Sequence, residues 1–411
     1  TWFSSGMWTF STLGWPETFK NGKKSRDLAK FHPTQVLETG YEILTLWVSR
    51  MIMMSLFAIG EVPFEKVYLH GMVLDKHGKK MSKSKGNGID PLDMIEKYGT
   101  DAVRLSLLLG TTPGNDVRIS EEKIESFRNF VTKLWNIYRY FSQSDKSKIF
   151  EKIEKKDIKT LTDRWIVSKL NLVNKSVTDD LNNFRFSLAG EKLEKFTWGD
   201  LADWYLEIHK IEKNDKILGY VLDKILKLWH PFMPFVTEKI YQDLTEGKKI
   251  LMIEKWPEAD EKLIDKKAEK EFINLQNIIA KIRNLRSSYR ISPIQIINAY
   301  ADKIENREII ERLAKIKIIK KKPKIKTIKV NNLNLDIAAL IDVEKEIGRI
   351  EKELNNLQSA ILKTENLLKN DKFVNNAPAE IITSNKERIL EYKKKLESQQ
   401  DLLRDLRHLL K

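Results

Sequence analysis

The 411-residue chain contains no cysteine. This absence excludes disulfide bonds and thiolate metal sites, and it fits the reducing environment of the cytoplasm, where we expect the protein to act. No basic leader followed by an apolar core is present, and no long apolar or basic amphipathic anchor is evident, so we expect no membrane partner. The first residue is Thr1 rather than methionine, and we therefore expect the chain to be a fragment of a longer protein.

Positive charge, in contrast, is abundant. The formal net charge is +15, the isoelectric point is about 9.4, and 41% of the residues are hydrophobic. A chain of this length can bury more than one core, and we expect about two to four domains. The charge favours a polyanionic partner, with nucleic acid ahead of an acidic membrane. A lysine-rich and isoleucine-rich composition can also be a genome-wide bias, which leaves a second explanation for the charge.

The strongest local signal is a loop of lysines and serines. Residues 79–87 read Lys-Lys-Met-Ser-Lys-Ser-Lys-Gly-Asn, with Gly78 and Gly88 on either side. Glycines let a backbone approach a ligand, hydroxyl groups donate hydrogen bonds, and ammonium groups offset the negative charge that develops at a phosphoryl group. The loop therefore predicts a cationic flap that binds phosphate. On charge alone, a solvated lysine loop would be the better interpretation.

The sequence before this loop predicts a βαβ unit. Residues 36–59 read as a short strand, a glycine turn and an apolar helix, and residues 67–70 read as a second buried strand. This order is typical of half of a parallel nucleotide-binding sheet, in which ligands gather at the carboxyl ends of the strands. Those ends are Thr39-Gly40 and His70-Gly71.

The sequence after the loop predicts helices. Asp90 and Pro91 are typical of a helix start and Gly99 of its end, with a second helix expected over residues 100–109. Beyond residue 115 the apolar residues recur at helical spacing. An arginine-bearing helix and β-rich segments then predict a small α/β connector.

The last seventy residues follow a heptad rhythm in two runs, separated by a turn over residues 370–378. We expect an antiparallel hairpin, while dimerisation through one long coil is the alternative. The predicted domains are an α/β half of a nucleotide-binding fold at 1–115, a helical bundle at 116–262, the connector at 263–341 and the hairpin at 342–411.

The order Lys80-Met81-Ser82-Lys83-Ser84 resembles the KMSKS loop of the class I aminoacyl-tRNA synthetases. The segment Trp2-Phe3-Ser4-Ser5 and the terminal hairpin narrow the resemblance to the valyl-tRNA synthetases, over essentially all 411 residues. The resemblance implies the second half of a class I Rossmann-like catalytic domain, a helical anticodon-binding domain and a coiled-coil arm that binds tRNA. It also implies valine, ATP with Mg²⁺ and tRNA(Val) as substrates, and a monomeric enzyme with no metal site of its own.

The resemblance also implies roles for individual residues. Lys80 and Lys83 would be the catalytic lysines at the triphosphate. The ATP site would comprise Gly40, Glu42, His70, Gly71, Met72, Lys80, Met81, Ser82, Lys83 and Ser84. The valine pocket would comprise Trp2, Ile43 and Trp47, although ordinary core packing explains such side chains equally well. Arg283, Arg286 and Arg290 would contact tRNA phosphates, or simply form a solvated face.

Two features of the family are missing from the sequence. The six histidines, at 32, 70, 77, 209, 230 and 408, never form the family's His-x-Gly-His motif, and the editing insertion is absent. We therefore expect the fragment to be inactive alone and unable to edit. A noncatalytic tRNA-binding protein and an isoleucyl-type synthetase remain the alternatives.

Overall fold

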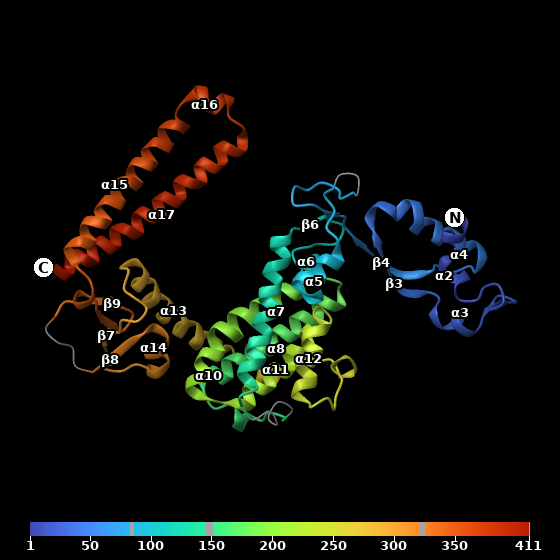
Figure 1. Cartoon of the computed structure of the whole chain (residues 1–411), viewed down its shortest axis with the longest axis horizontal. Coiled ribbons are helices and arrows are strands. Elements are labelled where there is room, and N and C mark those ends of the chain that lie inside the picture. Colours follow the sequence, from blue (N-terminus) through green and yellow to red (C-terminus); the bar gives the residue numbers. More distant parts are fainter. Residues whose placement is uncertain (83–85, 145–150, 321–324, 411) are drawn as a thin grey trace. The chain divides into compact units, whose positions relative to one another are not determined.

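The computed structural model describes residues 1–82, 86–144, 151–320 and 325–410 (Figure 1). These residues form two compact units, Thr1–Glu269 and Lys270–Lys411. Lys83 and Ser84, two residues of the predicted ATP site, lie outside the described residues.

A βαβ unit organises the start of the first unit. Strands β3 (Thr34–Gly40) and β4 (Phe64–His70) pair in parallel, and α4 (Ser49–Ala58) lies on the connection between them. A 3₁₀ turn (Tyr41–Ile43) and a π-helical turn (Leu44–Val48) precede α4. The buried residues that hold strands and helix together are Leu37, Val48, Met51 and Phe64.

The remaining elements before residue 120 are short. They are α1 (Trp2–Gly6), α2 (Trp8–Ser11), β1 (Phe19–Lys20), β2 (Lys23–Lys24), α3 (Arg26–Phe31), β5 (Val73–Leu74), α5 (Pro91–Tyr98), α6 (Thr100–Leu108) and β6 (Val117–Arg118). Strands β5 and β6 pair in parallel. The predicted start of α5 is confirmed, since the Asp90 side chain accepts a hydrogen bond from Leu92 N (2.8 Å) and Pro91 is the first helical residue. Gly99, with φ of 89°, ends this helix as predicted.

Helices make up the rest of the first unit. They are α7 (Glu121–Phe141), α8 (Leu161–Asn182), α9 (Phe186–Glu194), a π-helical stretch (Lys195–Tyr205), α10 (Leu206–Glu212), α11 (Asp215–Trp229) and α12 (Pro234–Leu244). The side chains of Thr160 and Asp163 form a capping box at the start of α8. Large aromatic side chains fill the bundle core, and Trp165, Tyr205 and Trp229 are almost fully buried.

The second unit contains a small sheet and a helical hairpin (Figure 1). Helix α13 (Lys266–Ser288) leads into it. The sheet has the strand order β8-β7-β10-β9. Its elements are β7 (Ile297–Tyr300), α14 (Arg307–Ala314), β8 (Ile316–Ile319), β9 (Ile328–Val330) and β10 (Leu333–Asp336). Buried isoleucines and leucines alternate with exposed polar residues along the strands, so one sheet face is apolar and the other polar.

The hairpin is formed by α15 (Val343–Leu368), the short α16 (Asp371–Asn376) and α17 (Ala379–Leu410). The two long helices lie side by side in Figure 1. They are antiparallel, because ion pairs join Glu351 to Arg407 and Glu365 to Lys393. The buried side chains of the seam include Ile350, Leu354, Ile361, Leu403 and Leu406.

One helical stretch among the described residues, Tyr41–Ala58, is long and apolar enough to cross a membrane by these two criteria alone. The same criteria are met by core helices of soluble proteins, so this is weak evidence for a membrane span. Only 17% of the stretch is buried in the structure. Most of its apolar side chains are therefore at least partly exposed.

Candidate nucleotide site

The carboxyl ends of β3 and β4 bring two predicted site residues together. Gly40 lies directly opposite His70 in the parallel register. The carboxylate of Glu42 folds back over Gly40, so closely that a Cβ atom at position 40 would lie 2.5 Å from Glu42 Oε2. His70 Nε2 lies 3.4 Å from Glu38 Oε1. Hydrogen-bonding groups therefore surround a position that only glycine can occupy without displacing Glu42.

Gly71 permits a close approach between two backbone segments. A Cβ atom at this position would lie 1.8 Å from the carbonyl oxygen of Asn115. On the next residue, Met72 N donates to Asp116 Oδ1 (2.8 Å), and Met72 O accepts from Val117 N (2.9 Å). The residues that follow β4 are thus fixed against the segment at 115–117.

The described part of the predicted phosphate loop is anchored at two successive residues. Lys80 is exposed and pairs with Leu74 in an isolated antiparallel β-bridge. Met81 is partly buried and packs against the core cluster of Ala102, Val103, Ile119 and Ile124. This packing gives Met81 a structural role, and its predicted contact with ATP stays a prediction.

Two polar residues at the base of the loop were not predicted as site residues. The Asp75 carboxylate accepts hydrogen bonds from His77 N, Lys79 N and the amide of Asn87. These hydrogen bonds lower the pKa of Asp75, and the one from Lys79 N has the largest effect. Both residues flank the motif, but no sequence pattern indicates that they contact each other.

The three residues of the predicted valine pocket lie on neighbouring segments. Trp47 Nε1 donates to Ser5 O (3.2 Å), which ties the π-helical turn to α1. The Arg50 guanidinium lies 4.2 Å from the ring centroid of Trp2, whose exposed fraction is 53%. Ile43 is partly buried at the end of the 3₁₀ turn. The pocket itself stays a prediction.

Helix α6 connects the nucleotide site to the helical bundle. The buried carboxylate of Asp101 accepts hydrogen bonds from Val236 N (2.7 Å) and Phe235 N (3.3 Å) at the start of α12. Burial raises the pKa of Asp101. Arg104 donates to the carbonyl oxygens of Pro231 and Phe232. One turn of α6 therefore fixes the corner between α11 and α12.

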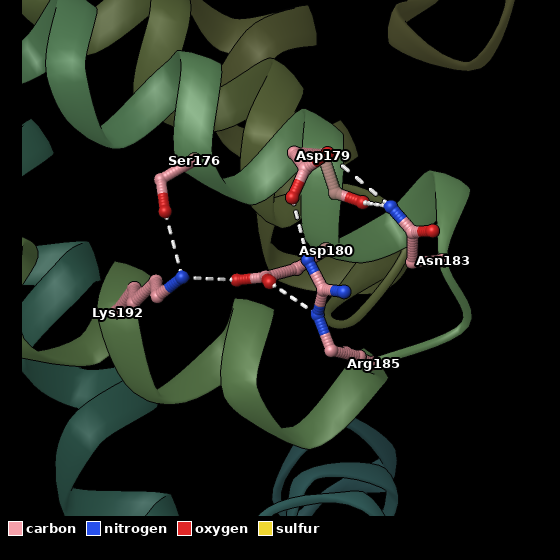
Figure 2. A network of polar contacts seen from close by, with 6 residues as sticks. All are labelled: Ser176, Asp179, Asp180, Asn183, Arg185 and Lys192. Carbon is pink, nitrogen blue, oxygen red and sulfur yellow. Dashed lines mark hydrogen bonds and ion pairs between the residues drawn. The ribbon is translucent and has the colours of Figure 1, made fainter.

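A second connection joins β4 to the corner between α8 and α9. The ring centroid of Tyr68 lies 6.2 Å from that of Phe184 and 5.3 Å from that of Phe186. Figure 2 shows the polar network that holds this corner, in which Asp180 accepts hydrogen bonds from Arg185 Nε (2.8 Å) and Lys192 Nζ (2.5 Å). Burial alone would raise the pKa of Asp180, but these two cations hold it below its usual range.

A cavity of about 780 Å³ lies beside this aromatic contact. Its lining includes Glu38 and His70 from the sheet, Arg104 from α6 and Phe186 from α9. The cavity therefore adjoins both the strand ends and the helical bundle.

The predicted tRNA-binding arginines differ in their surroundings. Arg286 is only 6% exposed, and its guanidinium donates to the carbonyl oxygens of Ser292, Gln295 and Lys315. This residue organises the connector, and its contact with tRNA stays a prediction. Arg283 is exposed and donates to Leu313 O (3.0 Å), and Arg290 is exposed at a positive φ of 52°.

The net positive charge is concentrated in the connector. Residues 270–341 carry 16 Lys and Arg against six Asp and Glu, for a net charge of +10 out of +15. The hairpin, residues 342–411, carries 14 Lys and Arg against 13 Asp and Glu and is almost neutral. Lys317 and Lys329 are exposed on the polar face of the sheet, on the strand at each edge. Among the described residues, no carboxylate forms an ion pair with either lysine.

Three family models match consecutive parts of the chain. They are described as tRNA synthetases class I (I, L, M and V), at residues 1–120, the anticodon-binding domain of tRNA ligase, at 163–301, and the valyl tRNA synthetase tRNA binding arm, at 342–407. The chain belongs to the valyl-tRNA synthetase family of class I. The helical bundle contains most of the anticodon-binding match, and the hairpin coincides with the arm.

Similar proteins support the same family. The chain is 37% identical to the valine–tRNA ligases of Thermotoga maritima and Clostridium acetobutylicum, over 99% of its own length. It spans about half of these relatives, 48% and 49%, and corresponds to their C-terminal part. A leucyl-tRNA synthetase from Agrobacterium radiobacter, solved with tRNA and LeuAMS, shares the fold. The TM-score of the match is 0.54 and the sequence identity is 23%. The match covers 68% of the present chain and 38% of the leucyl-tRNA synthetase chain.

Proposed function

We propose that the chain is the C-terminal part of an enzyme that activates valine with ATP and transfers it to tRNA(Val). The observation that carries this proposal is the KMSKS sequence on the segment that follows β4, in a chain that valine–tRNA ligases match over 99% of its length. The enzyme would act in the cytoplasm as a monomer.

In this reaction the carboxylate of valine attacks the α-phosphate of ATP, and pyrophosphate leaves. The valyl group then passes to the terminal adenosine of the tRNA. No protein nucleophile is required, so the protein contributes orientation and charge stabilisation. Lys80 and Lys83 would stabilise the triphosphate, while Ser82 and Ser84 would contact it as hydroxyl donors.

The strand ends would hold the rest of the nucleotide. His70, Gly71 and Met72 would lie along the adenine. Glu42 would accept hydrogen bonds from the ribose hydroxyls or from the valine amino group, and Gly40 would allow the nucleotide to approach.

Mg²⁺ would enter as part of the substrate MgATP. Among the described residues, no group of three or more His, Asp or Glu side chains is arranged to hold a metal ion. The phosphate oxygens of ATP would therefore supply the ligands of the ion, together with water.

The test is valine-dependent exchange of pyrophosphate into ATP by the complete polypeptide. Lys80→Ala and Lys83→Ala should each lower kcat by about 10²–10³, because each removes a positive charge that stabilises the transition state. Lys76→Ala is the matched control, since Lys76 is an exposed lysine upstream of the motif, and its kcat should stay within twofold of the unchanged enzyme, roughly the level at which a surface change is silent.

The alternatives predict other results. A noncatalytic tRNA-binding protein would bind tRNA and show no exchange with any amino acid. An isoleucyl-type enzyme would show exchange that depends on isoleucine rather than valine.

A further inference from the structure

The side chain of Asn87 joins the two ends of the phosphate loop. Its Oδ1 accepts a hydrogen bond from Ser82 N (3.0 Å), on the entering segment. Its Nδ2 donates to Asp75 Oδ2 (2.8 Å) and to Lys80 O (3.3 Å). The Asn87 amide thus connects the end of the loop to three residues earlier in the sequence, namely Asp75, Lys80 and Ser82.

Asp75 is the fixed point of this arrangement. Only 8% of the residue is exposed. Its Oδ1 accepts hydrogen bonds from His77 N (2.9 Å) and Lys79 N (2.8 Å), while its backbone bonds to both Gly78 and Lys79. The carboxylate therefore stabilises the turn before the loop and leaves Oδ2 to hold Asn87.

These bonds fix the backbone on both sides of Met81. The carbonyl of Lys80 and the N–H of Ser82 both contact Asn87, while the Met81 side chain packs inward. Because successive side chains of an extended segment point in opposite directions, an inward Met81 directs Lys80 outward.

We propose that Asp75 and Asn87 are positioning residues, which hold Lys80 in the orientation needed for ATP activation. This inference rests on the proposed function. Neither side chain needs to touch the substrate. Coulomb energy varies inversely with distance, so a displaced Lys80 ammonium stabilises the leaving pyrophosphate less well.

The test is a swap of the two side chains in the complete polypeptide, measured by valine-dependent exchange. Asn87→Asp places two carboxylates in contact, and Asp75→Asn removes the charged acceptor. Each single variant should lower kcat by about 10- to 100-fold, with the KM for valine within about twofold, which is the pattern of an interaction made in the transition state. The double variant again pairs an amide with a carboxylate, but it places a carboxylate oxygen opposite Lys80 O and gives His77 N and Lys79 N a neutral acceptor in place of a charged one. Its kcat should recover to within about fivefold of the unchanged enzyme, as expected for coupled side chains.

Asp90→Ala is the control for loss of stability. Asp90 caps α5 directly after the loop but does not contact Asp75 or Asn87 among the bonds of the structure. This variant should lower the melting temperature and leave kcat unchanged. Equal kcat losses in Asp90→Ala and Asn87→Asp would assign the effect to stability and overturn the inference.

A double variant no more active than the singles would also overturn it, as would single variants with unchanged kcat. If the unsubstituted polypeptide showed no valine-dependent exchange, the proposed function would fail and the inference with it. If the unsubstituted polypeptide showed valine-dependent exchange but the double variant did not recover activity, the proposed function would stand and only this inference would fail.

Discussion

Two buried histidines make the stability of the first unit depend on pH. His209 is almost fully buried and lies 3.0 Å from Tyr140 Oη, with Asp215 close by. His32 is buried against Ser55 Oγ (3.0 Å). Burial lowers the pKa of both side chains, which outweighs the opposing effect of Asp215 at His209 and of Glu61 at His32.

We therefore expect these two histidines to make the unit less stable in acid. When the folded-state pKa lies below the unfolded value of about 6.5, the unfolded chain binds protons first. The contribution of each histidine to stability should be fully present above about pH 6.5 and should be lost as the pH falls from about 6.5 to the folded pKa. The loss is about 1.4 kcal/mol for each unit by which the folded pKa lies below the unfolded value. Urea midpoints at pH 7.5, 6.5 and 5.5 would measure this. His209→Gln should reduce the slope, whereas the exposed His77→Gln should not. Equal slopes in all three proteins would contradict the explanation.

Single residues also show where sequence reasoning reached its limit. Spacing placed Arg283 and Arg286 on one helix, but only the fold shows that Arg286 is surrounded by three carbonyl groups. Met81 lies inside a recognisable motif, yet its neighbours come from α6 and α7. Contacts between distant segments decide such roles, and no local pattern encodes them.

At the scale of elements, sequence signals predicted the ends of a helix correctly where short-range interactions determine those ends. Asp90, Pro91 and Gly99 predicted the limits of α5, because caps and φ preferences act within a few residues. The π-helical stretches at Leu44–Val48 and Lys195–Tyr205 were not predicted. An apolar run near helical spacing is compatible with both an α-helix and a π-helix, and packing selects between them.

The connector sheet is the element on which we expect salt-dependent tRNA binding to depend. Lysines that neutralise phosphates release counterions, with a slope of about 0.9 per phosphate in a plot of log affinity against log salt. Replacing Lys317 and Lys329 together by glutamine should lower the affinity of the chain for tRNA at moderate salt and reduce this slope by about 1 to 2. Filter binding over a range of potassium chloride concentrations would measure both.

A matched pair of lysines on the hairpin provides the control. Lys393 and Lys395 each form an ion pair, with Glu365 and Glu391 respectively. Because these charges are already balanced by neighbouring carboxylates, their replacement by glutamine should change the slope less. A larger change in the hairpin variant would place the main electrostatic contact on the arm instead.

At the scale of the whole molecule, exposed apolar side chains lie on the segments that carry the predicted valine pocket and on α4, which follows them. Phe57 is 92% exposed, and Phe3 and Leu46 are also exposed on α1 and the π-helical turn. Isolated exposed apolar side chains are ordinary, but a group of them marks an interaction surface. The relatives are about twice as long as this chain, and we propose that their N-terminal half covers this surface.

Co-expression with that half tests the idea. The N-terminal half of the Thermotoga maritima relative should copurify with the chain. Phe57→Lys should weaken the association by tenfold or more, because burying an unpaired ammonium group costs more than the roughly 1.4 kcal/mol that a tenfold change represents. Lys320→Glu, on the second unit, is the control and should have no effect. Copurification that is equal for Phe57→Lys and the unchanged chain would show that the halves meet elsewhere.

The hairpin is anchored at one end by a few bonds. Arg349 Nη2 donates to Ser288 O (3.0 Å), and Tyr289 Oη donates to Leu402 O (3.3 Å). The 26 residues of α15 rise roughly 39 Å, so a tilt of about 5° at the root would swing the far end by roughly 3 Å. Small changes in the contacts at the root of the hairpin are therefore amplified at its far end.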